Sequence, residues 1–127
     1  MINKISLILI LFFSCNFSDE SIKLSGGYSF VDEGKKHKVI IGKNNYIPCE
    51  VIDYDFDNNF IIVKQKPTDL CFYGKDSSFY KEGKQFNYYW IIDNSNKLFL
   101  GPLNFKEFSN SLKKLNVSDK LKLKPVN

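Results

Sequence analysis

"VIDYDFDNNFIIVKQ", residues 51–65, decides the fold, because it carries the clearest β-hairpin signal in the chain. Apolar and polar residues alternate with a period of two up to Asp57, and a second β-prone run starts at Phe60. Asn tolerates the left-handed backbone that a type I′ turn needs at both central positions, so Asn58-Asn59 is predicted as the two-residue loop. This register predicts three facing pairs: Phe56 with Ile61, Tyr54 with Val63, and Asp53 with Lys64.

Outside this hairpin, shorter β-prone runs predict the other strands: residues 26–31, 38–41, 86–93 and 97–100. Gly101-Pro102 is expected to end the last of them. Residues 66–85 show no sustained period, so we expect a long connection with a helical turn near Ser77–Lys81.

A C-terminal helix is predicted from its capping signals. Asn104 is a favourable N-cap, and Glu107 stands three residues later, which is the capping-box spacing. Asn116 can close the helix. Two further sets support it: the staple pair Leu103 and Phe108, and the apolar stripe Phe105, Phe108, Leu112 and Leu115. The predicted class is α+β, mainly β: an antiparallel meander sheet of about five to six strands with one C-terminal helix packed on it.

Size and composition limit the function classes. The chain has 127 residues and a formal charge of +4, and all eighteen of its basic residues are Lys. This length suits one domain with a modest core. Arg is the preferred residue for bidentate contacts to phosphate and guanine, so its absence argues against a nucleic-acid partner.

The first fifteen residues indicate export. A short basic start precedes a nearly unbroken apolar run at 5–13, which has the length of a signal-peptide core and is too short to span a bilayer. Ser14-Cys15 then resembles the junction at which a bacterial lipoprotein signal is cleaved and the cysteine acylated, although Phe12 stands where Leu is usual. We expect a signal peptide at 1–14, a lipidated Cys15 with a polar tether at 15–25, and one globular domain at 26–127. Ordinary secretion and a cytosolic core segment are the alternatives.

The remaining cysteines, Cys49 and Cys71, are candidates for a disulfide, since export permits one. Two inert buried thiols are the alternative, because the spacing alone cannot pair them.

No constellation of residues predicts catalysis, a metal or a cofactor. The alternating carboxylates Asp53, Asp55 and Asp57 resemble the start of a calcium loop, but Asn58 and Lys64 occupy the positions of its Gly and Glu. They fit the wet face of a strand better. His37 is the sole histidine, has lysine neighbours, and is expected to be exposed and inactive.

Tyr88, Tyr89 and Trp90 form a candidate binding face for a protein or a glycan. Tyr88 and Trp90 point to one side of their strand and Tyr89 to the other, so one set should pack under the helix. Core packing of both sets is the alternative.

Three blocks carry a resemblance to a known family: residues 25–28, residues 57–67, and YWIID at 89–93 followed by Gly101-Pro102-Leu103. They resemble a family of small bacterial lipoproteins of unknown function, domain of unknown function 3997. The resemblance implies export and lipidation, and it transfers no activity or catalytic residue.

These observations predict a membrane-tethered envelope or surface lipoprotein that serves as a binding module. Its expected partners are the lipid bilayer, through acylated Cys15, and an unknown protein or glycan. The expected location is the bacterial cell membrane or outer membrane. An inhibitor or immunity-type protein for an exported partner and a small envelope enzyme are the alternatives.

Overall fold

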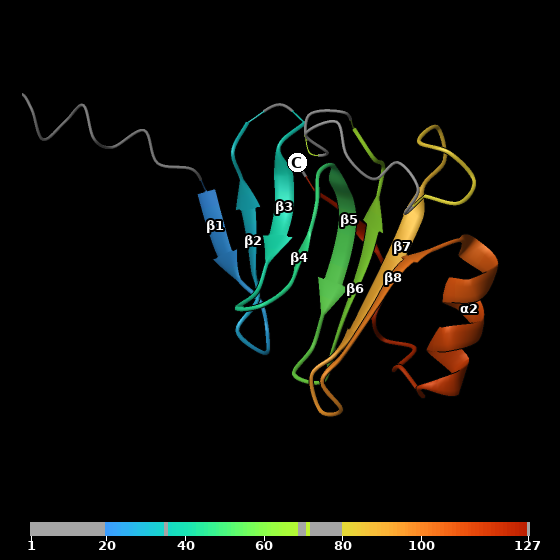
Figure 1. Cartoon of the computed structure of the whole chain (residues 1–127). Coiled ribbons are helices and arrows are strands. Elements are labelled where there is room, and N and C mark those ends of the chain that lie inside the picture. Colours follow the sequence, from blue (N-terminus) through green and yellow to red (C-terminus); the bar gives the residue numbers. More distant parts are fainter. Residues whose placement is uncertain (1–19, 35, 69–70, 72–79, 127) are drawn as a thin grey trace, which may run out of the picture.

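The computed structural model describes residues 20–34, 36–68, 71 and 80–126. The expected signal peptide, Cys15 and most of the expected helical turn near Ser77–Lys81 lie outside the described residues. The described part forms two antiparallel sheets and one helix, arranged as three layers (Figure 1). The mainly β, antiparallel class with one C-terminal helix is therefore confirmed.

The first sheet has the strand order β1-β2-β3-β4. Its strands are β1 (Glu20–Lys23), β2 (Ser29–Asp32), β3 (Lys38–Ile41) and β4 (Tyr46–Ile47). β1 falls in the segment predicted as a tether. It is ordered because it pairs with β2, and Ile22 lies opposite the buried Phe30. Described structure thus begins before the predicted domain boundary at residue 26.

The second sheet has the order β8-β7-β6-β5-β9. Its strands are β5 (Val51–Phe56), β6 (Phe60–Gln65), β7 (Tyr88–Asp93), β8 (Leu98–Leu103) and β9 (Lys124–Pro125). The β5–β6 hairpin has the predicted register, including the facing pairs Phe56 with Ile61, Tyr54 with Val63 and Asp53 with Lys64.

The turn of this hairpin differs from the prediction. Asn58 and Asn59 form the loop, but neither has a positive φ, so it is not a type I′ turn. The Asp57 carboxylate instead accepts the backbone N–H groups of Asn59 and Phe60, each at 2.8 Å. The Asp57 side chain therefore stabilises a loop in which both asparagines keep a negative φ. Its carboxylate accepts the hydrogen bonds that a backbone carbonyl would accept in a type I′ turn.

The prediction of a single sheet is wrong. The strands form two sheets that face each other across the main core. Phe30, Ile40 and Ile47 of the first sheet pack in one cluster with residues of the second: Val51, Ile61, Val63, Trp90 and Ile92. β7 is buried along its whole length. A strand buried on both faces needs a cover on each, and one helix supplies only one of them.

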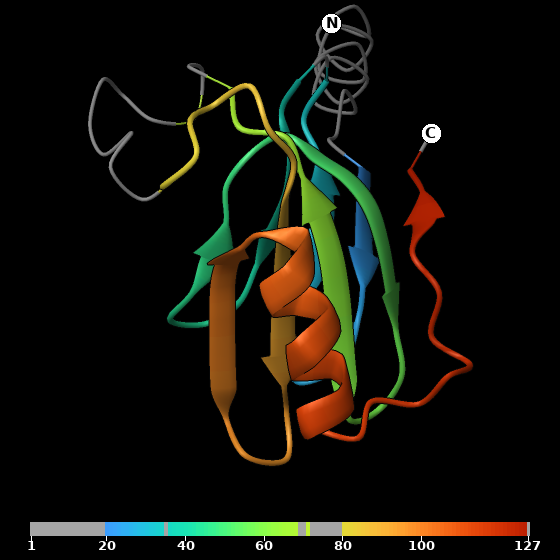
Figure 2. The same ribbon diagram turned by 90° about the vertical axis from the view of Figure 1, so that its right-hand side faces the viewer.

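The helix α2 (Phe105–Lys114) covers the outer face of the second sheet (Figure 2). Its anchor Phe108 is 3% exposed and stacks on Tyr89 with ring centroids 4.7 Å apart. Phe105, predicted to be part of the buried stripe, is 64% exposed. It lies at the first helical position, where its ring meets the Tyr89 ring edge-on at 5.5 Å.

Both ends of α2 are closed as the sequence predicts. The Asn104 side chain accepts the Glu107 N–H at 2.8 Å, and the Glu107 carboxylate accepts the Asn104 N–H at 3.0 Å, which completes the capping box. At the other end, Asn116 has φ 56° and the Val117 N–H donates to the Leu112 carbonyl at 3.0 Å. This is a Schellman ending with Asn in the left-handed position.

β8 continues past the residues expected to end it. The register between β7 and β8 shifts between Tyr89 and Ile91, which marks a bulge at Gly101-Pro102. Gly101 has φ 147° and lies so close to the Trp90 indole that a Cβ would collide with the ring. A glycine at this point lets the strand pass over the indole and keep pairing.

Candidate functional site

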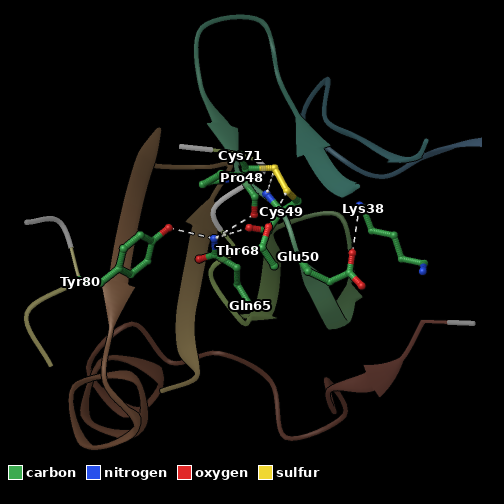
Figure 3. The surroundings of a disulfide bond; sticks show 8 residues. All are labelled: Lys38, Pro48, Cys49, Glu50, Gln65, Thr68, Cys71 and Tyr80. Atoms are coloured by element: carbon green, nitrogen blue, oxygen red, sulfur yellow. Dashed lines mark hydrogen bonds between the residues drawn. A yellow bond between two sulfur atoms is a disulfide. The ribbon is translucent and has the colours of Figure 1, made fainter. Parts of the chain in front are cut away.

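Cys49 and Cys71 form a disulfide, with Cα atoms 5.6 Å apart (Figure 3). This is the predicted candidate pairing. Cys49 lies between β4 and β5, and Cys71 lies in the connection that follows β6. The bond therefore ties two segments that are brought together by the pairing of β5 with β6. We call this region the disulfide corner: residues 48–50, 65–68, 71 and 80.

The backbone beside the disulfide continues the β5–β6 ladder. Glu50 and Lys66 exchange two backbone hydrogen bonds, at 3.0 and 2.9 Å. The Glu50 carboxylate also accepts the backbone N–H of Lys38 at 3.3 Å, which links the corner to the first sheet. Both sheets thus hold the segment that carries Cys49.

A buried amide organises the interior side of the corner. Gln65 is fully buried, and its Nε2 donates to the Pro48 carbonyl and to the Tyr80 hydroxyl, each at 2.9 Å (Figure 3). Its Oε1 accepts the Trp90 indole N–H at 2.6 Å. Burial raises the pKa of Tyr80 to about 12, so the phenol stays neutral at physiological pH.

The two cysteines of the disulfide differ in solvent exposure, but the sulfur of each accepts a hydrogen bond. Cys49 is 0% exposed, whereas Cys71 is partly exposed. Each sulfur accepts a hydrogen bond: Cys71 Sγ from the Cys49 backbone N–H at 3.1 Å, and Cys49 Sγ from the Thr68 hydroxyl at 3.3 Å. A disulfide sulfur carries no hydrogen, so the hydroxyl is the donor in the second contact.

His37 lies beside the disulfide and is not exposed, whereas the sequence predicts an exposed and inactive histidine. It is partly buried, and its ring nitrogen and both sulfurs lie within 4.8 Å of one another. The turn between β2 and β3 brings it there, through the His37 N–H to Gly34 carbonyl bond at 3.1 Å. Within the described ranges, this trio is the one grouping found of three or more His, Cys, Asp or Glu side chains spaced to hold a metal ion.

An open groove of about 480 Å³ lies next to this trio. Two exposed apolar residues that face each other across β3 and β4, Ile41 and Tyr46, are 42% and 55% exposed. Cys71 and His37 also line this groove. We call it the β3–β4 groove, and its lining is Glu33, His37, Val39, Ile41, Gly42, Lys43, Asn44, Asn45, Tyr46 and Cys71. The lining offers apolar contact, amide hydrogen bonds, both signs of charge and one sulfur.

The candidate aromatic binding face is not exposed. Tyr88, Tyr89 and Trp90 are 2%, 9% and 6% exposed. Tyr89 lies under α2, as expected for one set. Of the opposite set, Trp90 is covered by the first sheet, whereas Tyr88 packs on Tyr80 with ring centroids 4.7 Å apart. The alternative of core packing describes all three residues.

The alternating aspartates serve the fold. Asp55 accepts the Lys122 backbone N–H at 2.9 Å and lies 3.6 Å from the Lys124 ammonium, so it holds the C-terminal segment against β5. Asp57 shapes the hairpin loop, as described above. The calcium-loop likeness of this stretch therefore has a structural explanation.

Sequence reasoning named both cysteines but missed the groove and the position of His37. No local pattern points to them, because they depend on where the turn after β2 lies relative to the connection after β6. The part of the chain that the structure describes contains no helix long and apolar enough to cross a membrane.

Comparison with known protein families identifies the family of this chain. The model of a protein family of unknown function, DUF3997, matches residues 25–127, so the chain belongs to this family. No curated protein and no solved structure matches the chain.

Proposed function

We propose that this DUF3997 protein is an exported envelope lipoprotein, anchored through Cys15, whose domain binds a partner protein in the β3–β4 groove. Catalysis is not part of this proposal. The observation that supports the lipid anchor is the Ser14-Cys15 junction, which directly follows the apolar run at 5–13.

The anchor has a simple physical basis. An acylated cysteine inserts hydrocarbon chains that contribute about 0.8 kcal/mol for each buried methylene group, and stable attachment needs more than one chain. The disulfide supports the same location, because such bonds persist in oxidising compartments outside the cytosol.

The groove supports a protein partner. Exposed aromatic side chains next to aliphatic ones are typical anchors of protein interfaces, and Tyr46 and Ile41 form such a pair across β3 and β4. Lys43 and Glu33 at the lining can add charge pairing at the rim. A tether between lipid and domain would hold the bound partner close to the membrane.

The anchor is tested by labelling cells with a fatty-acid analogue. The unaltered chain should take up label and sediment with membranes, and Cys15→Ala should abolish the uptake. Ser14→Ala is the matched control, because it keeps a small residue before the cysteine and should label normally. Equal labelling of Cys15→Ala would overturn the lipid anchor.

The groove is tested separately with a photo-crosslinking amino acid in the full chain in its native membranes. Placed at Tyr46, it should give a discrete protein adduct that Ile41→Asp removes. Placed at Phe105, which is exposed on α2, it should give none. Equal adducts at both positions, or none at Tyr46, would contradict the groove assignment. An adduct with an exported toxin or enzyme would select the inhibitor or immunity-type alternative.

A further inference from the structure

We propose that the Cys49–Cys71 disulfide is exchangeable and that Cys71 is the sulfur that reacts with a thiol entering the β3–β4 groove. This gives the groove a covalent chemistry beyond reversible binding. The inference does not rest on the lipid anchor or on a partner protein, because a small thiol is enough to reveal it.

Access makes the reaction directional. Cys71 lines the groove and is partly exposed, whereas Cys49 is fully buried. Thiol–disulfide exchange needs the attacking thiolate to approach along the S–S axis, so an accessible sulfur reacts and a buried one leaves. Attack from the groove therefore falls on Cys71, and Cys49 becomes the leaving thiolate.

Both thiolates that exchange would produce have a hydrogen-bond donor already in place. The Thr68 hydroxyl lies 3.3 Å from Cys49 Sγ, and the Cys49 backbone N–H lies 3.1 Å from Cys71 Sγ. Donors of this kind favour the thiolate over the thiol and make a cysteine a better leaving group. A disulfide that serves as a staple alone needs neither.

His37 supplies the means of moving a proton at this site. Its ring lies within 4.8 Å of both sulfurs, and an imidazole nitrogen can accept or donate a proton. The neighbouring charged residues of the groove lining are Glu33 and Lys43. The imidazole can thus take the proton of an incoming thiol and later return one to a departing thiolate.

The exchange balances as two steps. An incoming thiolate forms a bond to Cys71 Sγ, the S–S bond breaks, and Cys49 leaves as a thiolate that accepts the Thr68 hydrogen bond. A second thiolate then attacks the sulfur of the first thiol in the mixed disulfide, and Cys71 leaves as a thiolate beside the Cys49 N–H. Two thiols become one disulfide, the protein disulfide becomes two thiols, and their two protons pass to the protein.

The test uses the full chain in detergent micelles with Cys15→Ser, which leaves Cys49 and Cys71 as its only cysteines. Oxidised glutathione is the probe, because a free cysteine thiol forms the mixed disulfide by exchange with it and releases one reduced glutathione. Mass spectrometry counts the adducts. Cys49→Ser should trap one glutathione on Cys71. The matched variant Cys71→Ser should trap at least tenfold less, because its remaining thiol is buried. Equal trapping in the two variants, or none on Cys71, would overturn the proposal.

A second measurement does not depend on either cysteine variant being folded. The chain with both cysteines is equilibrated with reduced and oxidised glutathione, and free thiols are counted after alkylation. Thr68→Val should lower the equilibrium constant for reduction about tenfold, and Thr68→Ser should restore it. His37→Gln should slow the approach to equilibrium about tenfold at neutral pH. Resistance of the disulfide to glutathione, or identical behaviour of these variants, would show a purely structural bond.

Discussion

The segment from β7 to the end of α2 and the disulfide corner are stabilised in different ways. In the first, residues close in sequence form each other's hydrogen bonds. Asn104 caps α2 by accepting the Glu107 N–H, and Asn116 closes the last turn of the helix. In the corner, the partners come from distant positions, as when Gln65 contacts Pro48 and Trp90. An element held by contacts between sequence neighbours can be predicted from the sequence. A network of hydrogen bonds between distant residues can be recognised only in the folded chain.

The largest effect is expected on the helix side of this comparison. Phe108→Ala should lower the free energy of unfolding by about 3–5 kcal/mol, because it empties a buried aromatic site stacked on Tyr89. Asn104→Ala should cost about 1 kcal/mol, the usual value of a lost N-cap. Denaturant unfolding of the full chain in detergent measures both. Equal losses would mean that the packing of α2 contributes no more than its cap.

The corner should show a smaller loss with strong coupling. Gln65→Leu should cost about 2–4 kcal/mol, because it leaves the Trp90 indole N–H and the Pro48 carbonyl without partners in the interior. Adding Trp90→Phe removes one orphaned donor, so the double variant should lose less than the sum of the two single variants. Additive losses in the same denaturant assay would show that the buried amide does not act as a network.

The smallest effect concerns pH and belongs to the corner as well. The folded-state pKa of Tyr80 is raised from 10.0 to about 12, first by burial. Its contribution to stability is therefore fully present below pH 10 and is lost as the pH rises to about 12. Tyr80→Phe should flatten the decline of unfolding free energy across this range, and Tyr54→Phe is the comparison. An unchanged slope for Tyr80→Phe would contradict the burial of the phenol.

The elements with local signals could be predicted in some detail. The β5–β6 register followed from the alternation of its residues, and the ends of α2 followed from Asn104, Glu107 and Asn116. The loop residues Asn58 and Asn59 were predicted correctly, but the type I′ turn was wrong, because the Asp57 side chain accepts the N–H groups of Asn59 and Phe60. The strands β4 and β9 were missed because two residues are too few to show a period. β1 was missed because its polar sequence favours a tether, and it forms a strand through its pairing with β2.

The candidate site was likewise predictable from the sequence only in part. The sequence supplied the pair Cys49 and Cys71 and left its pairing open. The fold placed their Cα atoms 5.6 Å apart and set His37 beside them. The burial of Trp90 also depended on the fold, because the sheet that covers it comes from residues far earlier in the chain.

By itself, the sequence determined the mainly β class, the central hairpin register and the capped helix, because hydrophobic period and capping act over a few residues. The tertiary structure alone decided that the strands form two facing sheets and that the disulfide, His37 and the β3–β4 groove lie together. The physical reason is that β7 is buried on both faces of its sheet, so a second layer must cover the face that α2 leaves open. The position of that cover depends on contacts between distant residues, and no short stretch of sequence encodes it.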